Sequence, residues 1–208
     1  MSGAPEAEIP GRATTATGPR VLLATRNAGK IAELRRMLAG DAVVLGLDDV
    51  VAFEDQAETG ATFEENALAK ARHASAVTGE VVLADDSGLT VGALNGMPGV
   101  LSARWSGRHG DDSANTALLL GQLADVPDER RTAAFVCAVA IVVPGPHGLE
   151  RVVSASWPGR VIRDERGANG FGYDPIFVPH ESDADGSGRT SAELAPQEKD
   201  ALSHRSRA

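Results

Sequence analysis

The chain has 208 residues, 42% apolar and 24% charged, enough for one sizeable core but too few for two independent domains. Its net charge of -9 argues against a nonspecific nucleic-acid or anionic-membrane binder, and no apolar run is long enough for a transmembrane helix. The single cysteine, Cys137, excludes an intrachain disulfide and a multi-thiolate zinc site, and its apolar surroundings predict burial. We therefore expect a cytoplasmic protein.

The first twenty residues are rich in Ala, Gly, Pro and Thr, so we expect residues 1–20 to form a flexible tail. Residues 21–208 are then a single domain. It opens with VLLATRNAGK, residues 21–30, where a strand runs into a short polar loop. Ile31, Leu34 and Leu38 follow at helical spacing, which predicts a helix.

The loop between this strand and helix is a candidate phosphate site, because a helix start offers free N–H groups and Lys30 adds a cation. It is not a Walker loop, since Ala24 stands where the first glycine is needed and Ile31 where the metal-binding Ser or Thr belongs. Any metal must therefore be held elsewhere. The alternative is an ordinary strand-to-helix turn with Asn27 as the helix N-cap.

Helix and strand patterns alternate through the rest of the chain. Thr62 and Glu65 can form a capping box that begins a helix, and Gly79 can end it. Further segments predict a strand over 42–49, two strands over 81–94 on either side of residues 85–88, a helix over 112–124, long strands over 132–143 and 151–162, a loop over 167–179, a mobile loop over 181–190 and a short helix over 196–205. The pattern predicts an α/β protein with a mixed sheet flanked by helices.

Carboxylates supply the first candidate chemistry. Asp85 and Asp86 are expected at a turn after an apolar strand, where a carboxylate pair suits a hard cation such as Mg²⁺, and Glu58 is a third oxygen ligand from a neighbouring loop. The alternative is that the two aspartates only punctuate a β-turn and that Glu58 precedes a helix.

Two other segments offer ligand contacts. Lys70 either reaches a phosphate or lies on the solvated surface of its helix. In GFGYD, glycines bracket Phe171, and Tyr173 and Asp174 follow, so a nucleobase could stack on Phe171 beside a carboxylate. The alternative is ordinary core packing of these aromatic rings.

Six segments together resemble one known family, the inosine triphosphate pyrophosphatases, over almost all of residues 21–207. The motifs are TRNAGK, ETGATFEENALAKA, ADDSGL, GMPGVLSARWSG, FGYDPIF and EKDALSHR, in the family's order and spacing. The resemblance implies hydrolysis of non-standard purine nucleoside triphosphates such as ITP, dITP and XTP to the monophosphate and pyrophosphate. It also implies a mixed α/β fold with a long twisted sheet, a nucleotide cleft between two lobes, and a homodimer.

The same resemblance implies roles for individual residues. Asp86 would be the proton acceptor and a contact for Mg²⁺, with Glu58 as a further metal ligand and Asp85 assisting. Substrate would be bound by the loop and helix start, by the strand and by the later segments, namely Thr25, Arg26, Asn27, Ala28, Gly29, Lys30, Lys70, Ser87, Phe171, Gly172, Tyr173, Asp174, Lys199, His204 and Arg205. Arg205 and Asp174 would favour a 6-oxo purine over adenine by hydrogen-bond matching.

The chain departs from the family pattern at its ends. The N-terminal tail has no counterpart, and relatives continue beyond the SHR segment with another helical segment, so we expect His204 and Arg205 to be less firmly anchored. Two other functions stay open. One is a catalytically inactive nucleotide-binding regulator, which the three carboxylates argue against, and the other is a pyrophosphatase for pyrimidine or methylated nucleotides.

Overall fold

A computed structural model describes residues 18–54 and 56–208. Most of the predicted flexible tail, residues 1–17, lies outside this range. A six-stranded sheet with strand order β2-β1-β3-β4-β5-β6 forms the centre of the fold. Its strands are β1 (Arg20–Leu23), β2 (Val43–Leu45), β3 (Val82–Val91), β4 (Thr132–Val142), β5 (Glu150–Val161) and β6 (Phe177–Pro179).

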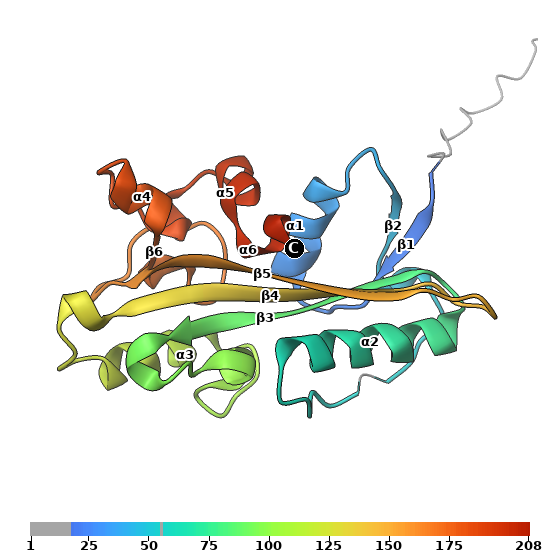
Figure 1. Ribbon diagram of the computed structural model, residues 1–208, viewed down its shortest axis with the longest axis horizontal. Coiled ribbons are helices and arrows are strands. Elements are labelled where there is room, and N and C mark those ends of the chain that lie inside the picture. The colour runs from blue at the N-terminus through green and yellow to red at the C-terminus, as the bar shows by residue number, and fades with distance from the viewer. Residues whose placement is uncertain (1–17, 55) are drawn as a thin grey trace, which may run out of the picture.

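Helices cover both faces of the sheet. Figure 1 shows α2 and α3 below the long strands and α1, α4, α5 and α6 above them. Their bounds are α1 (Ala28–Met37), α2 (Phe63–Thr78), α3 (Asp112–Gln122), α4 (His180–Ala184), α5 (Pro196–Leu202) and α6 (His204–Arg207). In the part of the chain that the structure describes, no helix is both long and apolar enough to cross a membrane.

The sheet is mixed in direction. Strands β1, β2 and β3 pair in parallel, while β3, β4, β5 and β6 pair antiparallel, with β3 and β4 in register over their whole length. Parallel neighbours need a crossover, and α1 and α2 supply the two crossovers here. The mixed α/β class predicted from the sequence is therefore confirmed.

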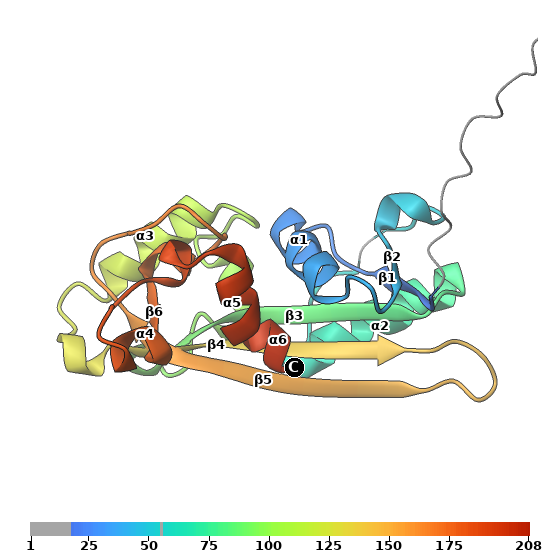
Figure 2. The same cartoon turned by 90° about the horizontal axis from the view of Figure 1, so that it is seen from above.

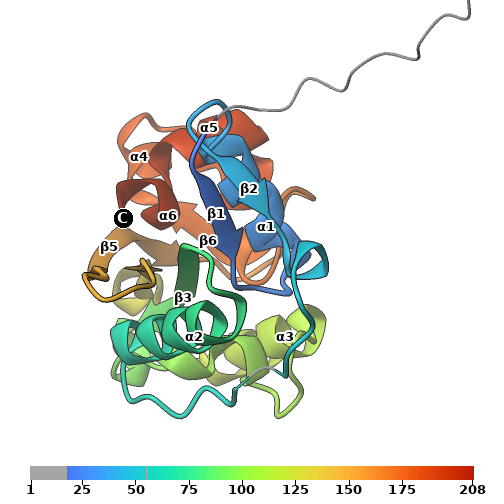
Figure 3. The same cartoon turned by 90° about the vertical axis from the view of Figure 1, so that its right-hand side faces the viewer.

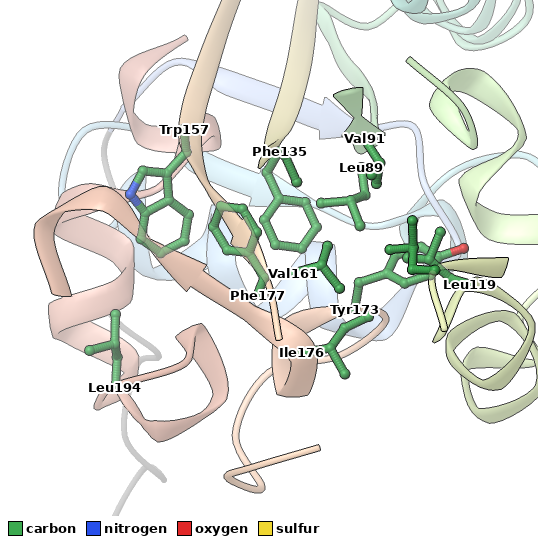
Figure 4. Close-up of a cluster of buried hydrophobic side chains, with 12 residues drawn as sticks. Leu89, Val91, Leu119, Phe135, Trp157, Val161, Tyr173, Ile176, Phe177 and Leu194 are labelled. Carbon is green, nitrogen blue, oxygen red and sulfur yellow. The ribbon is translucent and has the colours of Figure 1, made fainter. Parts of the chain in front are cut away.

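Two apolar clusters give the molecule its two lobes. One, shown in Figure 4, packs Leu89, Leu119, Phe135, Trp157 and Phe177 between the ends of β3, β4 and β5 and helix α3. The other packs the alanine face of α2 and the start of β3 against β1 and β4. Figure 2 shows β3, β4 and β5 running through both lobes, with α1, β1 and β2 at one end and α3, α4 and β6 at the other. The end-on view in Figure 3 places β3 between α2 and the upper helices.

Several predicted elements agree with the structure. Helix α2 begins after Thr62, whose hydroxyl accepts from the Glu65 N–H at 3.2 Å, and it ends at Gly79 with a left-handed φ of 69°. Helix α3 and the long strands β4 and β5 also match their predicted positions closely.

Several elements differ from the prediction. The strand expected over 42–49 is a strand only at Val43–Leu45, and the helix expected over 196–205 is interrupted at Ser203. Residues 82–91 form one continuous strand, so Asp85 and Asp86 lie within a strand and not at a turn. The segment predicted as a loop over 167–179 ends in β6, and the predicted mobile loop over 181–190 begins as α4. Pairing with β4 holds residues 82–91 in a strand and pairing with β5 holds β6, although both segments contain residues that favour turns.

Candidate active site

A cavity of about 710 Å³ lies between the lobes, within the size range of small-molecule sites, which is roughly 300–1,000 Å³. Its lining comes from the β1–α1 loop, α2, β3, the segment 171–174 and the C-terminal helices. All but three of the predicted site residues line it. The three exceptions are Ala28, Gly29 and Asp85.

The cavity opens beside β3 because β1 is short. The pairing of β1 with β3 ends at Leu23 opposite Leu83, so the next residues of β3 have no neighbouring strand on that side. Asp85, Asp86 and Ser87 occupy this stretch of β3. Of these, Asp86 and Ser87 line the cavity from the middle of the sheet.

The β1–α1 loop is both a capped strand-to-helix turn and a candidate phosphate site. The Asn27 side chain accepts from the Lys30 N–H at 3.0 Å and caps α1, as the ordinary-turn alternative requires. The loop nevertheless lines the cavity with Thr25, Arg26, Asn27 and Lys30. The helix start and its lysine therefore face a space that an anion could occupy.

Ala28 and Gly29 belong to the first turn of α1 and do not line the cavity. Gly29 instead allows close packing: a Cβ on this residue would lie 2.4 Å from the Phe171 ring. The substrate contacts of Ala28 and Gly29 stay predictions, and Gly29 in addition makes room for the Phe171 ring.

Asp85 and Asp86 point to opposite faces of the sheet, since successive side chains of a strand alternate. The Asp85 carboxylate contacts α1 and α6, where Lys30 Nζ is 3.1 Å and Arg205 Nη2 is 3.0 Å away. Asp86 contacts α2, where it accepts from Asn66 Nδ2 at 3.0 Å. The two carboxylates therefore do not form the paired metal site that the sequence predicted.

Asp85 is better described as a buried counter-charge. Its side chain is 0% exposed. Burial disfavours its ionised form, but Lys30 and Arg205 outweigh burial and lower the pKa of Asp85 well below its usual range. The prediction that Asp85 is a metal ligand is corrected accordingly, because it has no access to the cavity.

Asp86 remains the carboxylate that faces the cavity from β3. Burial raises its pKa, and nearby Glu58 adds to the rise while Lys70 and Lys30 oppose it. A carboxylate with a raised pKa is a stronger base than an ordinary aspartate. This property suits the abstraction of a proton from water.

Lys70 lies between two carboxylates and is not a solvated surface residue. Its ammonium group is 3.0 Å from Glu58 Oε1 and 3.4 Å from Asp86 Oδ1, and it donates to the Asp85 carbonyl at 2.8 Å. Burial lowers the pKa of Lys70, but the charges of Asp86 and Glu58 outweigh burial and raise the pKa above its ordinary value. The lysine therefore stays charged. For Glu58, burial is outweighed by Lys70, which lowers its pKa.

The acidic residues fit a metal ion only in part. Among residues 18–54 and 56–208 there is no cluster of three His, Cys, Asp or Glu side chains arranged to hold a metal. Glu58 and Asp86 both line the cavity and share Lys70 as a neighbour. Two carboxylates plus phosphate oxygens and water are a usual coordination set for Mg²⁺, so the residues fit a metal that arrives with a polyphosphate.

A buried chain of charges adjoins the cavity, and three of its members, Lys199, Asp174 and Arg205, line it. Glu33 of α1 accepts from both Arg205 and Lys199, with 2.9 Å between Lys199 Nζ and Glu33 Oε1. Lys199 also pairs with Asp174 at 2.5 Å, and Arg205 donates to Ser87 Oγ at 3.0 Å. The chain connects α1, β3, α5 and α6 with the segment that follows Phe171.

Phe171 is partly exposed and lies beside these cations. The Lys199 Nζ is 5.1 Å from the centre of its ring. Tyr173 lines the cavity as predicted, while its ring also belongs to an apolar core and its hydroxyl donates to the Ser102 carbonyl at 2.9 Å. It touches the cavity wall but serves mainly to anchor the segment. Asp174 anchors it too, accepting from the Phe171 N–H at 2.8 Å.

The terminal helix is held more firmly than the sequence led us to expect. His204 and Arg205 are both 4% exposed. The His204 ring stacks on Phe135 with ring centres 5.0 Å apart, and Arg205 is fixed by its ion pairs with Asp85 and Glu33. Buried ion pairs therefore anchor the terminal helix.

Sequence reasoning missed several residues in and around the site, among them Asp112 in the cavity lining. Glu33, Asn66 and Arg104 look like ordinary polar residues on their segments, yet Glu33 and Asn66 are 4% and 2% exposed, and Arg104 Nη1 lies 2.9 Å from Glu58 Oε2. A signal was present for two of them. Glu33 lies three positions after Lys30 and Asn66 four positions before Lys70, so each shares a helix face with a predicted site lysine.

Fold and site together define a mixed α/β protein whose cavity joins a helix start and several lysines to a basic carboxylate and an aromatic ring. The chain belongs to the Ham1 family, which it matches over residues 21–208. The family expected from the sequence motifs is thereby confirmed.

Known relatives cover nearly the whole chain. A dITP/XTP pyrophosphatase of Mycolicibacterium paratuberculosis is 62% identical over 192 residues, covering 90% of this chain and 91% of the relative. The crystal structure of a nucleoside-triphosphatase (dITP/XTP pyrophosphatase) from Mycobacterium abscessus is 59% identical, with a TM-score of 0.72 over 90% of this chain and 95% of that one. The Ham1 protein of Staphylococcus aureus is 38% identical, with a TM-score of 0.76 over 90% and 92%. These matches confirm the predicted class of enzyme, a hydrolase.

Proposed function

We propose that this protein hydrolyses non-standard purine nucleoside triphosphates, ITP, dITP and XTP among them, to the monophosphate and pyrophosphate and so cleanses the nucleotide pool. The relatives named dITP/XTP pyrophosphatase support this substrate class. The observation that carries the proposal is a single cavity whose lining includes three lysines and an arginine together with a carboxylate and an aromatic ring, namely Lys30, Lys70, Lys199, Arg205, Asp86 and Phe171.

The triphosphate is assigned to the β1–α1 loop and the neighbouring lysines. Thr25, Asn27 and Lys30 line the cavity at the start of α1, where backbone N–H groups and the helix dipole favour an anion. Lys70 supplies a second cation from α2. Both lysines are partly buried, at 13% and 20% side-chain exposure, which strengthens their attraction for phosphate oxygens.

Glu58 and Asp86 are the residues that would hold Mg²⁺ together with phosphate oxygens. The ion would neutralise charge on the phosphate oxygens when it is bound. Lys70, which now lies between the two carboxylates, would turn from them toward a phosphate, because a lysine side chain is flexible and its ammonium keeps its charge.

Asp86 is the general base of the proposed reaction. It takes a proton from a water whose oxygen forms a bond to the α-phosphorus, while the bond from that phosphorus to the bridging oxygen breaks and pyrophosphate leaves. Asn66 holds the Asp86 carboxylate by its amide N–H and leaves the other oxygen near Lys70. The carboxylate is thus oriented before substrate arrives.

Base selection is assigned to the cations beside Phe171. Lys199 and Arg205 present only donors, which match the O6 acceptor of a 6-oxo purine and oppose the amino group of adenine. Their positions are set by Glu33, Asp85 and Asp174, so the donors cannot easily turn away from a mismatched base. A buried mismatch of this kind costs about 1–3 kcal/mol.

One assay tests the reaction directly. The protein is incubated with Mg²⁺ and with ITP, dITP, XTP, ATP or GTP separately, and the products are identified by chromatography. We expect IMP and pyrophosphate from ITP in one step, with much slower turnover of ATP. Accumulation of IDP with orthophosphate, or equal turnover of ATP, would contradict the proposal.

Homodimer formation and a cytoplasmic location are part of the same proposal. They rest on the family resemblance and on the cysteine-poor composition, and both stay predictions. The absence of nucleic-acid and membrane partners likewise rests on the net charge of -9.

A further inference from the structure

The segment that carries Phe171 lies between two residues that leave its backbone unusually free. Gly170 and Gly172 flank the ring with φ values of 79° and 60°. Glycine tolerates this left-handed region at no steric cost, but it also has more alternative conformations than other residues. The direction of the Phe171 ring must therefore be set by contacts with other parts of the chain.

Two carboxylates make such contacts with successive backbone N–H groups. Asp174 accepts from the Phe171 N–H at 2.8 Å, and Asp112 accepts from the Gly172 N–H at 2.7 Å. Asp174 belongs to the same segment. Asp112 lies 60 positions earlier, in the first turn of α3, and it lines the same cavity as Phe171.

Within the described part of the chain, the Asp112 carboxylate accepts a hydrogen bond from the Gly172 N–H and forms no ion pair, which distinguishes it from Asp174. The Asp174 carboxylate also pairs with Lys199 and accepts a hydrogen bond from the Ser191 hydroxyl, so changing Asp174 would disturb several groups at once. The Asp112 contact acts on the Gly172 backbone directly and fixes the Phe171 segment to α3. Charge-assisted bonds of this length are stronger than those between neutral groups.

We propose that Asp112 is a positioning residue for base recognition, because its bond to the Gly172 N–H holds the Phe171 ring in the orientation on which the base stacks. The inference rests on the proposed function only for the identity of the ligand. A fixed ring needs no ordering when the base binds, and this saves binding free energy.

The first test compares Asp112→Ala with Asp111→Ala. Asp111 lies at the same helix start, and its carboxylate caps α3 by accepting from the Ala114 N–H at 3.1 Å. We expect Asp112→Ala to raise KM for ITP about threefold to tenfold with little change in kcat. Asp111→Ala should lower Tm and leave KM nearly unchanged. Asp112→Asn keeps an acceptor oxygen and should restore most of the wild-type KM.

Two further measurements separate positioning of the ring from general damage. Inhibition by inorganic tripolyphosphate, which has no base, should be the same in wild type and Asp112→Ala. In a Phe171→Ala background, Asp112→Ala should have no further effect on KM, since it acts through the ring. An equal rise in KM in that background, or weaker inhibition by tripolyphosphate, would overturn the proposal.

Hydrogen exchange makes the test independent of the reaction. The amide of Gly172 should exchange faster in Asp112→Ala than in Asp111→Ala, whatever nucleotide the enzyme prefers. Unchanged exchange at Gly172 would overturn the inference. Failure of the wild type to convert ITP into IMP and pyrophosphate would instead overturn the proposed function and leave the exchange result to decide the role of Asp112.

Discussion

Neighbouring aspartates in the middle of β3 have different environments because a strand turns successive side chains to opposite faces. Asp85 meets Lys30 and Arg205 above the sheet, whereas Asp86 meets Asn66 and Lys70 below it. Opposite charges lower the pKa of Asp85, and burial raises that of Asp86. One residue therefore serves charge balance and the other is suited to act as a base.

The residue-scale prediction concerns Asp86. Asp86→Asn removes the basic oxygen but little volume, so kcat for ITP should fall by about 100-fold or more while nucleotide binding is largely kept. Single-turnover kinetics and equilibrium binding of ITP measure the two quantities separately. Wild-type kcat in this variant would show that Asp86 is not the base.

Asp85→Asn is the matched control for that variant, since it makes the same chemical change one residue away. It leaves Lys30 without its buried counter-charge and Arg205 with Glu33 alone, and breaking a buried ion pair typically costs about 3–5 kcal/mol. We expect a marked fall in the free energy of unfolding for Asp85→Asn and a small one for Asp86→Asn. Asp86→Asn should therefore mainly lower kcat, and Asp85→Asn should mainly lower the free energy of unfolding.

At the scale of elements, the packing of α1 against the Phe171 segment depends on one glycine. Gly29 lies in the first turn of α1, and an added Cβ would meet the Phe171 ring at 2.4 Å. The ring is the larger group, and its backbone is flanked by two permissive glycines. Its displacement is thus the expected response to a clash.

Gly29→Ala should therefore raise KM for ITP severalfold, although alanine normally stabilises a helix by up to about 1 kcal/mol relative to glycine. Gly121→Ala in α3 is the control, because a Cβ there meets nothing within 4 Å. We expect this control to raise Tm slightly and leave KM unchanged. Combining Gly29→Ala with Phe171→Ala should remove the penalty of the first change.

At the scale of the whole molecule, the C-terminal helices connect both lobes through buried polar groups. Arg205 pairs with Glu33 of α1 and Asp85 of β3, and His204 stacks on Phe135 of β4. Burial lowers the pKa of His204 well below its ordinary value, and Arg205 and Lys199 lower it further. His204 is consequently neutral in the folded protein at neutral pH.

This neutral histidine makes stability depend on pH. Below about pH 6.5 the unfolded chain binds a proton at His204 that the folded chain does not, so stability falls as the pH falls, by up to about 1.4 kcal/mol per unit. Stability from this group is fully present above pH 6.5. We expect the decline between pH 6.5 and 5.5 to be weaker in His204→Gln, measured by denaturant unfolding at each pH. Equal slopes for the two proteins would contradict this account.

Much of the fold could be predicted because the signals are local. Helix α2 has its cap, its alanine face and its glycine end within one stretch, and β4 is a long apolar run that a turn separates from β5. The continuity of β3 could not be seen, because Asp85, Asp86, Ser87 and Gly88 resemble a turn in isolation. Ten residues of pairing with β4 hold them in a strand.

By itself the sequence determined the family, the mixed α/β class and most of the residues that line the cavity, since these depend on motifs and periodicities within short stretches. Only the tertiary structure decided which carboxylate faces the ligand, that Glu33 joins Arg205 to Lys199, and that Asp112 reaches the Phe171 segment. These contacts join residues 60 to 172 positions apart. They are made by strand pairing and helix packing, which set the direction of each side chain, and no spacing along the chain encodes that direction.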